Sequence, residues 1–115
     1  MKLLHITITT QDIEKSAEFY REIAGLKVER ANNGAPFKIV FLANSQGETA
    51  VELVENKSAP KYENAPSIGF HVGDVKAYRE QLIEKGFAPT PIVSPVPNVE
   101  FFYVEDPNGI KVQFS

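Results

Sequence analysis

The chain has 115 residues, a formal net charge of −3 and no cysteine. This length suffices for one domain with a hydrophobic core, and the lack of cysteine excludes disulfides, thiolate metal ligands and a cysteine nucleophile. The acidic balance, without a long basic run, argues against nucleic acid or a membrane surface as partner. No apolar run approaches the roughly 20 residues of a membrane helix, and the N-terminus lacks the apolar core of a signal peptide. We therefore expect a cytoplasmic protein.

The first half of the chain predicts a strand, a helix and three more strands. Residues 3–10 alternate between apolar and polar side chains, which predicts a half-buried strand with His5 and Thr7 on its polar face. Asp12 has the position of a helix N-cap and Gly25 that of a helix end. The later strands are expected at 26–30, 37–42 and 48–55, with polar turns at 32–34 and 45–47.

A similar order follows in the second half. Residues 57–66 contain two prolines and no periodicity, so they are predicted as a linker. A strand over 67–73 leads to a helix that begins after Asp74 and ends at Gly86. Residues 88–98 are rich in proline, which predicts a loop or an irregular edge because proline is excluded from central strands.

The last segment, 99–115, predicts a hairpin. Its turn contains Pro107 followed by Asn-Gly, the residue pair most typical of tight hairpin turns. Alternation in the final strand places Gln113 on the polar face. In the preceding strand the pair Phe101 and Tyr103 shares one face and the pair Phe102 and Val104 the other, and the sequence does not show which pair faces a cavity.

The two halves form an internal repeat of strand, helix and strands. We expect one domain of two βαβββ modules, 1–56 and 67–115, joined by the linker 57–66. A single module is too small to bury both faces of its sheet. The expected fold is therefore α+β, with the modules paired within a chain or across a dimer into a curved eight-stranded sheet around a cavity. Aligning the helix caps carries His5 onto Ser67, and aligning the helix ends carries Glu52 onto Gln113.

Several short motifs occur in a characteristic order. They are His-x-x-Ile, Asp-Ile-Glu-Lys-Ser-x-x-Phe-Tyr, Gly-Leu-Lys-Val, Val-Glu-Leu, Val-x-Asp-Val and Glu-Asp-Pro-Asn-Gly. This pattern resembles the vicinal-oxygen-chelate superfamily, which contains glyoxalase I, extradiol dioxygenases, and the bleomycin- and fosfomycin-resistance proteins. The resemblance covers nearly the whole chain, and it implies paired βαβββ modules and a homodimer.

The resemblance also implies four metal-binding positions. In glyoxalase I-like members they carry His, Glu, His and Glu; here they fall on His5, Glu52, Ser67 and Gln113. Two ligand types are kept and two are lost. The dioxygenase and fosfomycin-resistance chemistries use the first, third and fourth positions, of which only His5 remains, so both are disfavoured. His5 and Glu52 with Gln113 would hold Zn²⁺, Ni²⁺ or Mn²⁺ weakly, and otherwise no cofactor is expected.

Three functions stay open from the sequence. The first is a glyoxalase/bleomycin-resistance-type protein that binds a small organic molecule in its cavity with an incomplete metal site. The second is a metal-dependent lyase or isomerase resembling lactoylglutathione lyase, in which Glu52 is the catalytic base. The third is a dimeric interaction module whose cavity is vestigial. The expected ligand-binding residues are Thr7, Ser67, His71, Tyr103 and Gln113, and the expected metal ligands are His5, Glu52 and Gln113.

Overall fold

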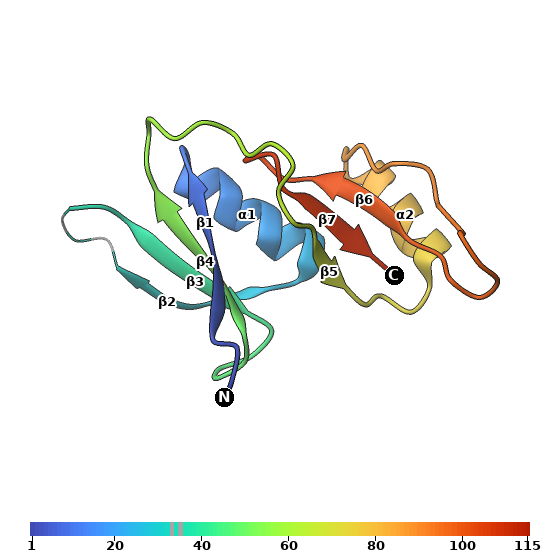
Figure 1. Cartoon of the computed structure of the whole chain (residues 1–115), viewed down its shortest axis with the longest axis horizontal. Helices are drawn as coiled ribbons and strands as arrows, with labels where there is room; N and C mark the ends of the chain where they lie inside the picture. The colour runs from blue at the N-terminus through green and yellow to red at the C-terminus, as the bar shows by residue number, and fades with distance from the viewer. Residues whose placement is uncertain (33, 35) are drawn as a thin grey trace. The chain divides into compact units, whose positions relative to one another are not determined.

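The computed structural model describes residues 1–32, 34 and 36–115, so part of the turn predicted at 32–34 lies outside the described residues. The described residues form two compact units, Met1–Lys61 and Tyr62–Ser115. Each unit combines one α-helix with one sheet of parallel and antiparallel strands, which confirms the α+β class (Figure 1). No helix in the described ranges is long and apolar enough to span a bilayer.

The first unit contains a four-stranded sheet in the order β1-β4-β3-β2. Strands β1 and β4 are parallel, and the other neighbours are antiparallel. Between Val28 and Arg30 the pairing of β2 with β3 shifts by one residue, which places a β-bulge at Glu29. The elements are β1 (His5–Thr10), α1 (Ile13–Ala24), β2 (Lys27–Asn32), β3 (Ile39–Ala43) and β4 (Ala50–Glu55).

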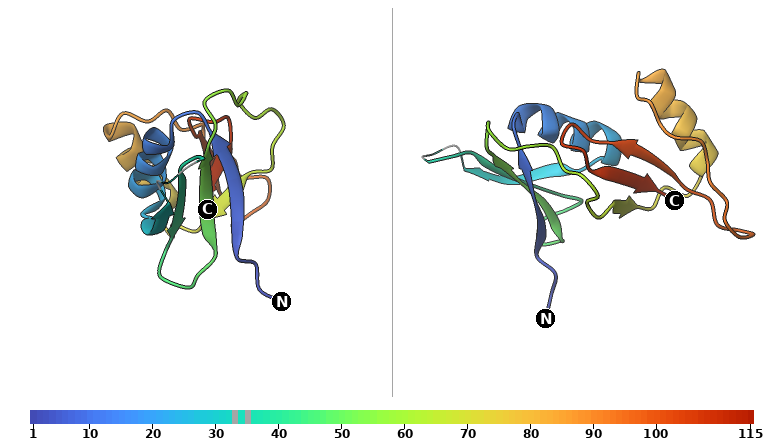
Figure 2. Two further views of the ribbon diagram at one scale, coloured as in Figure 1. Left: turned by 90° about the vertical axis from the view of Figure 1, so that its left-hand side faces the viewer. Right: turned by 45° about the horizontal axis from the view of Figure 1, so that its top comes forward.

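Helix α1 covers one face of this sheet (Figure 2). As predicted, its N-cap is Asp12, whose Oδ1 accepts a hydrogen bond from Lys15 N at 3.1 Å, and its end is Gly25 at φ 65°. The apolar side of the helix packs chiefly on β3 and β4, with Tyr20 and Ile23 fully buried. The opposite face of the sheet, which we call the open face of the first unit, carries no helix of its own unit.

The predicted burial of the apolar side of β1 is only partly right. Ile8 is buried, but Leu4 and Ile6 are 65% and 43% exposed. The reason is that β1 is an edge strand and α1 lies mainly over β3 and β4. The N-terminal half of β1 therefore receives no cover from the helix.

The second unit contains a three-stranded sheet in the order β5-β7-β6, with α2 against one face. Its core is aromatic: the ring of Phe114 lies 5.4 Å from that of Phe102, 6.0 Å from that of Phe70 and 5.3 Å from that of Tyr78. Phe102 is thus buried, and Tyr103 faces the other side of the sheet. The elements are β5 (Ile68–Phe70), α2 (Val75–Glu84), β6 (Phe102–Glu105) and β7 (Lys111–Phe114).

The structure corrects the expected number of strands, because the described residues form seven strands rather than eight. The missing strand falls in the proline-rich segment, where only an isolated bridge joins Val93 to Phe101. Next to it the Thr90 hydroxyl accepts a hydrogen bond from Tyr103 N at 2.8 Å, while Thr90 N donates to Tyr103 O at 2.9 Å. The Thr90 side chain therefore accepts a hydrogen bond that a backbone carbonyl would accept in a regular strand pair. The prolines on either side have no N–H group with which to continue the pairing.

The strand predicted over 67–73 is also shorter than expected. Strand β5 ends at Phe70, so Ser67 precedes it and His71 follows it. Asp74 caps α2 as predicted, with its Oδ1 accepting from Ala77 N at 3.0 Å. The helix ends at Glu84 with Lys85 as its C-cap, and Gly86, the predicted end, follows with a φ of 94°.

The turn between β6 and β7 is held by its own side chains and by the preceding segment. Asp106 is buried, and its Oδ1 accepts hydrogen bonds from Asn108 N and Ile110 N, both at 2.8 Å. Asn108 O in turn accepts from Tyr62 N at 2.8 Å. Gly109 has a φ of 91°, and a Cβ at this position would lie 2.5 Å from Tyr62 O. The Asp-Pro-Asn-Gly sequence therefore fixes the chain around Tyr62 as well as the hairpin.

Candidate functional site

A row of four side chains crosses the open face of the first unit, one from each strand. Thr7 of β1 is in register with Glu52 of β4, Glu52 with Phe41 of β3, and Phe41 with Arg30 of β2. Residues in register on neighbouring strands point to the same side of a sheet. The strand order thus brings a hydroxyl, a carboxylate, an aromatic ring and a guanidinium into one line.

Glu52 is the centre of the polar end of this row. Its Oε1 accepts a hydrogen bond from Thr7 Oγ1 at 2.5 Å and lies 3.5 Å from His5 Nε2. The Glu52 side chain is only 14% exposed, whereas that of His5 is 37% exposed. Both contacts use Oε1, so within the described part of the chain Oε2 has no hydrogen-bond partner. A half-buried carboxylate held on one side can accept a proton or a hydrogen bond from a bound molecule.

Phe41 joins the polar end of the row to a cation. The His5 ring meets it edge to face, with centroids 5.7 Å apart and an angle of 78° between the planes. On the other side, Arg30 Cζ lies 4.0 Å from the centre of the Phe41 ring, a distance typical of a cation–π contact. Contacts with the Phe41 ring therefore hold His5 on one side of this ring and Arg30 on the other.

The second unit has a corresponding but neutral row on the side of its sheet away from α2. Gly69 is in register with Gln113, and Gln113 with Tyr103. Gln113 Nε2 donates a hydrogen bond to Tyr103 Oη at 3.3 Å, and the ring of Phe101 meets that of Tyr103 edge to face at 5.7 Å. The structure thus brings together two of the predicted ligand-binding residues, Tyr103 and Gln113, on one face.

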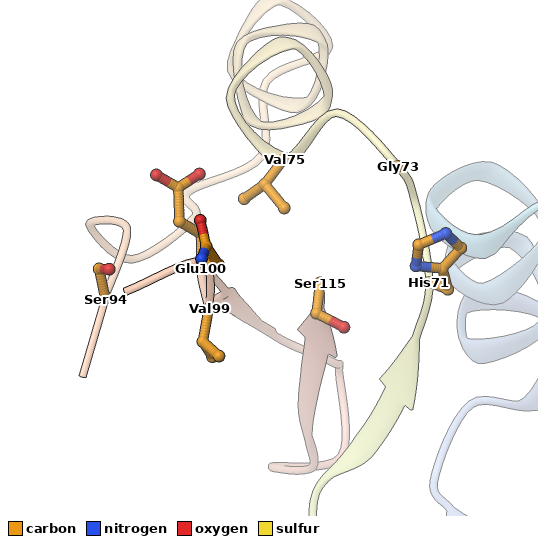
Figure 3. A pocket seen from close by; sticks show the side chains of 8 residues that line it. His71, Gly73, Val75, Ser94, Val99, Glu100 and Ser115 are labelled. Atoms are coloured by element: carbon orange, nitrogen blue, oxygen red, sulfur yellow. The ribbon is translucent and has the colours of Figure 1, made fainter. Parts of the chain in front are cut away.

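Ser67 and His71 do not join this row. Ser67 is exposed and lies before β5. His71 lines a separate cavity of about 630 Å³ at the end of the sheet, beside the start of α2. Figure 3 shows Val75 and Ser115 pointing into this cavity, with His71 and Glu100 on opposite sides. Its lining is completed by Gly73, Ser94, Asn98 and Val99, and includes neither Tyr103 nor Gln113.

The expected metal ligands are divided between the two units. Among the described residues no group of three or more His, Cys, Asp and Glu side chains is placed to hold a metal ion. In the first unit, His5 and Glu52 are adjacent, and Thr7 adds only a neutral hydroxyl, whereas catalytic zinc sites have three strong protein ligands. The first unit by itself therefore does not fit a tightly held metal, and Gln113 belongs to the second unit.

Two residues of the row, Phe41 and Arg30, were missed by the sequence prediction. Phe41 lies in an apolar run, where alternation gives no sign of which face a side chain takes. Simple alternation would put Arg30 on the same face as Val28, but the bulge at Glu29 turns it to the open face. No signal in the sequence marks that bulge.

Comparison with known proteins shows the family of the chain. The family model for the Glyoxalase/Bleomycin resistance protein/Dioxygenase superfamily matches residues 2–114. The chain belongs to this superfamily. This confirms the resemblance that the motif order indicated.

Curated and solved members of the superfamily cover almost the whole chain. The lactoylglutathione lyase of Haemophilus influenzae is 30% identical, with 99% of this chain and 91% of that protein aligned. The lactoylglutathione lyase of Escherichia coli O157:H7 is 27% identical, with 98% and 90% aligned. The solved trypanothione-dependent glyoxalase I of Leishmania major has a TM-score of 0.80 at 26% identity, over 99% of this chain and 85% of that one.

A further protein of known structure has the same fold. The antibiotic-binding protein TnmS3 of a Streptomyces species matches with a TM-score of 0.78 at 19% identity, over 100% of this chain and 94% of that one. At this identity the likeness concerns the fold alone. Proteins with this fold thus include some named as enzymes and one named for binding an antibiotic.

Proposed function

We propose that this superfamily member binds a small organic molecule on the open face of the first unit, with Glu52 as its central acceptor. The observation that supports this is the half-buried Glu52 carboxylate, held through Oε1 by Thr7 and His5 with Oε2 left for a ligand. A carboxylate that served only the fold would be expected to use both of its oxygens in contacts with other groups of the protein. Glu52 instead faces an exposed sheet surface beside an aromatic ring.

The chemistry of this end of the face is that of a hydrogen-bond acceptor with a neighbouring imidazole. A ligand hydroxyl, amide or amine would donate to Glu52 Oε2, and His5 would lie within reach of the same group. If the molecule has an acidic C–H or O–H, Glu52 would take its proton, because its Oε2 is the acceptor that faces the ligand. Thr7 would hold the carboxylate in position during that transfer.

The names of the curated relatives support a second function, that of a lyase or isomerase resembling lactoylglutathione lyase. In this alternative, Glu52 is the catalytic base and His5, Glu52 and Gln113 hold a divalent metal ion weakly. Such an ion, when bound, would stabilise negative charge on the substrate oxygens. His5 and Glu52 supply two ligands of the required type, which is fewer than the three of a tightly bound catalytic zinc.

Several finer expectations from the sequence stay predictions. They are the pairing of the two modules around one cavity, the homodimer, and the participation of Ser67, His71, Tyr103 and Gln113 in ligand binding. Each is tested separately from the role of Glu52. Analytical ultracentrifugation tests for the homodimer. NMR chemical-shift mapping, with a ligand from the screen described next, tests whether the residues of the second unit contact that ligand.

The replacement Glu52→Gln tests the proposed function. We expect ligands found by saturation-transfer NMR screening of small organic molecules to lose roughly tenfold in affinity, since a charge-assisted hydrogen bond is removed while the shape is kept. The matched control is Glu14→Gln, because the Glu14 side chain is 86% exposed and pairs with Lys38. Equal affinity of wild type and Glu52→Gln for every ligand found would refute the proposal.

The same variant separates the two functions. The lyase alternative predicts stoichiometric Ni²⁺ or Zn²⁺ in protein purified without chelator, and loss of this metal in Glu52→Gln. It also predicts turnover of a methylglyoxal–thiol hemithioacetal with metal added. Ligand binding without metal and without turnover would leave the binding function alone.

A further inference from the structure

Arg30 lies at the other end of the row from Glu52, and no described residue of its own unit forms an ion pair with it. The ion pairs among the described residues join His5 to Glu52 and Lys38 to Glu14, so Arg30 takes part in neither. Its side chain is exposed and lies over the Phe41 ring. A stacked guanidinium uses its face for the ring and keeps the N–H groups at its edge for a planar anion.

The surface between the two charges is apolar. Phe41 separates Glu52 from Arg30 in the row, and the next row places Val54 in register with Ile39. All three of these apolar side chains are half-buried, so each still offers surface to a ligand. Arg30 and Glu52 stand two strands apart, which corresponds to about 10 Å between their backbones.

From this charge distribution we propose that the ligand is an amphipathic organic anion about 10 Å long, whose anionic group binds Arg30. Its apolar part would lie over Phe41, Ile39 and Val54, and a hydroxyl or N–H at its other end would donate to Glu52. This inference rests on the proposed function, because it places the ligand on the same face. It adds the charge of the ligand and the residue that selects it.

The alternatives to an anion fit this face less well. A cationic ligand would meet the guanidinium of Arg30 and the exposed Lys27, which is in register with Ala43 on the same β2 edge. A neutral apolar ligand would cover Arg30 and Glu52 without replacing the water lost from either group. Only an anion with a donor at the far end satisfies both charges.

Two fluorescent probes with the same ring system test the proposal. The first is 6-anilinonaphthalene-2-sulfonate, whose sulfonate and anilino N–H lie at opposite ends of the naphthalene ring, and the second is N-phenyl-2-naphthylamine, which lacks the sulfonate. We expect Arg30→Gln to weaken binding of the sulfonate probe roughly tenfold and to change binding of the neutral probe less than about twofold. The matched control Lys38→Gln removes a cation that pairs with Glu14 of α1, and it should change neither affinity.

Circular dichroism checks that each variant is folded, because the sulfonate probe also binds partly unfolded protein. A second variant, Arg30→Lys, keeps the charge but loses the planar fork. We expect Arg30→Lys to bind the sulfonate probe more tightly than Arg30→Gln does, though less tightly than wild type. Its affinity for the neutral probe should equal that of Arg30→Gln. If Arg30→Gln proves unfolded, the comparison of the two probes on Arg30→Lys decides the matter, and equal weakening of both probes would refute the anion site.

The outcomes distinguish this inference from the proposed function. Equal loss of both probes in Arg30→Gln, or loss of neither, refutes the anion site. If Arg30→Gln gives one of these results but Glu52→Gln weakens the binding of both probes, the proposed function stands without the anion site. If Glu52→Gln and Arg30→Gln both leave the two affinities unchanged, both proposals fail. Sulfonate binding that falls as protein concentration rises, together with dimer formation by ultracentrifugation, would show that a second copy covers the face and would also refute the inference.

Discussion

The two units have the same plan of a helix on one side of a sheet, but their uncovered sides differ in charge. In the first unit the row contains Glu52 and Arg30, whereas the corresponding row of the second unit consists of Gly69, Gln113 and Tyr103. The repeat thus preserves the packing of helix on sheet while the chemistry on the other side diverges. Packing requires only apolar side chains of suitable size, so it places no restriction on the residues that face outward.

The units also differ in how their sheets are held together. The first unit completes four strands by main-chain pairing. The second unit pairs three strands. It has further hydrogen bonds with Thr90, which lies beside β6, and between the β6–β7 turn and Tyr62. The second unit therefore depends more on single residues outside its strands, and substitutions at those residues test this difference.

The largest effect is expected for Gly109→Ala. The new methyl group would lie 2.5 Å from Tyr62 O, and the φ of 91° is itself unfavourable for alanine. We expect a loss of about 3 kcal/mol in the free energy of unfolding, measured by urea denaturation. The control Gly86→Ala has a φ of 94° with nothing within 4 Å of the added atom, so it should cost about 1 kcal/mol. Equal losses would show that the contact with Tyr62 does not stabilise the unit.

A smaller effect should distinguish the two rows. Thr7→Val removes a hydrogen bond to a carboxylate, and we expect a loss of about 1.5 kcal/mol in unfolding free energy. Tyr103→Phe removes a neutral acceptor from Gln113 at 3.3 Å, with an expected loss of about 0.5 kcal/mol. Both values come from thermal or urea unfolding. If the Tyr103 substitution costs more, the polar interactions of the second unit are the stronger ones and the comparison is reversed.

The smallest effect concerns alkaline pH. Burial raises the pKa of Tyr78, in the helix–sheet packing of the second unit, above its ordinary value of 10.0. The unfolded phenol therefore loses its proton at lower pH than the folded one, so stability falls as the pH rises above about 10. Tyr78→Phe should reduce this fall in unfolding midpoints measured between pH 9 and 11, and Tyr103→Phe serves as the control. An unchanged pH dependence in Tyr78→Phe would assign it to other groups.

Local signals in the sequence predicted most of this fold. Asp12 and Asp74 cap the two helices because a short carboxylate after a strand can accept the free N–H groups of the first turn. The β6–β7 turn was likewise predicted from its own residues, although it also contacts Tyr62. The eighth strand was expected from the repeat alone and is absent from the described residues, whereas the loop or irregular edge predicted for residues 88–98 from their prolines is confirmed.

The candidate site was only partly predictable. His5, Thr7 and Glu52 were chosen from alternation and from the resemblance, and the structure places their side chains in contact. Arg30 was missed because a one-residue bulge reverses the direction of its side chain. The separation of His71 from Gln113 was missed because β5 ends three residues earlier than alternation indicated, at Phe70 rather than Gly73. Register and strand ends depend on partners distant in sequence, which alternation cannot show.

The parallel pairing of β1 with β4 also has a consequence for the order of folding. The Thr7–Glu52 contact joins residues 45 apart in the chain, whereas the Gln113–Tyr103 contact joins residues 10 apart. Closing the longer loop costs more chain entropy, and a ribosome must release nearly half of the protein before β4 can reach β1. The Gln113–Tyr103 pair can therefore form from a local hairpin, whereas the Thr7–Glu52 pair forms only after helix α1 and both intervening strands have been made.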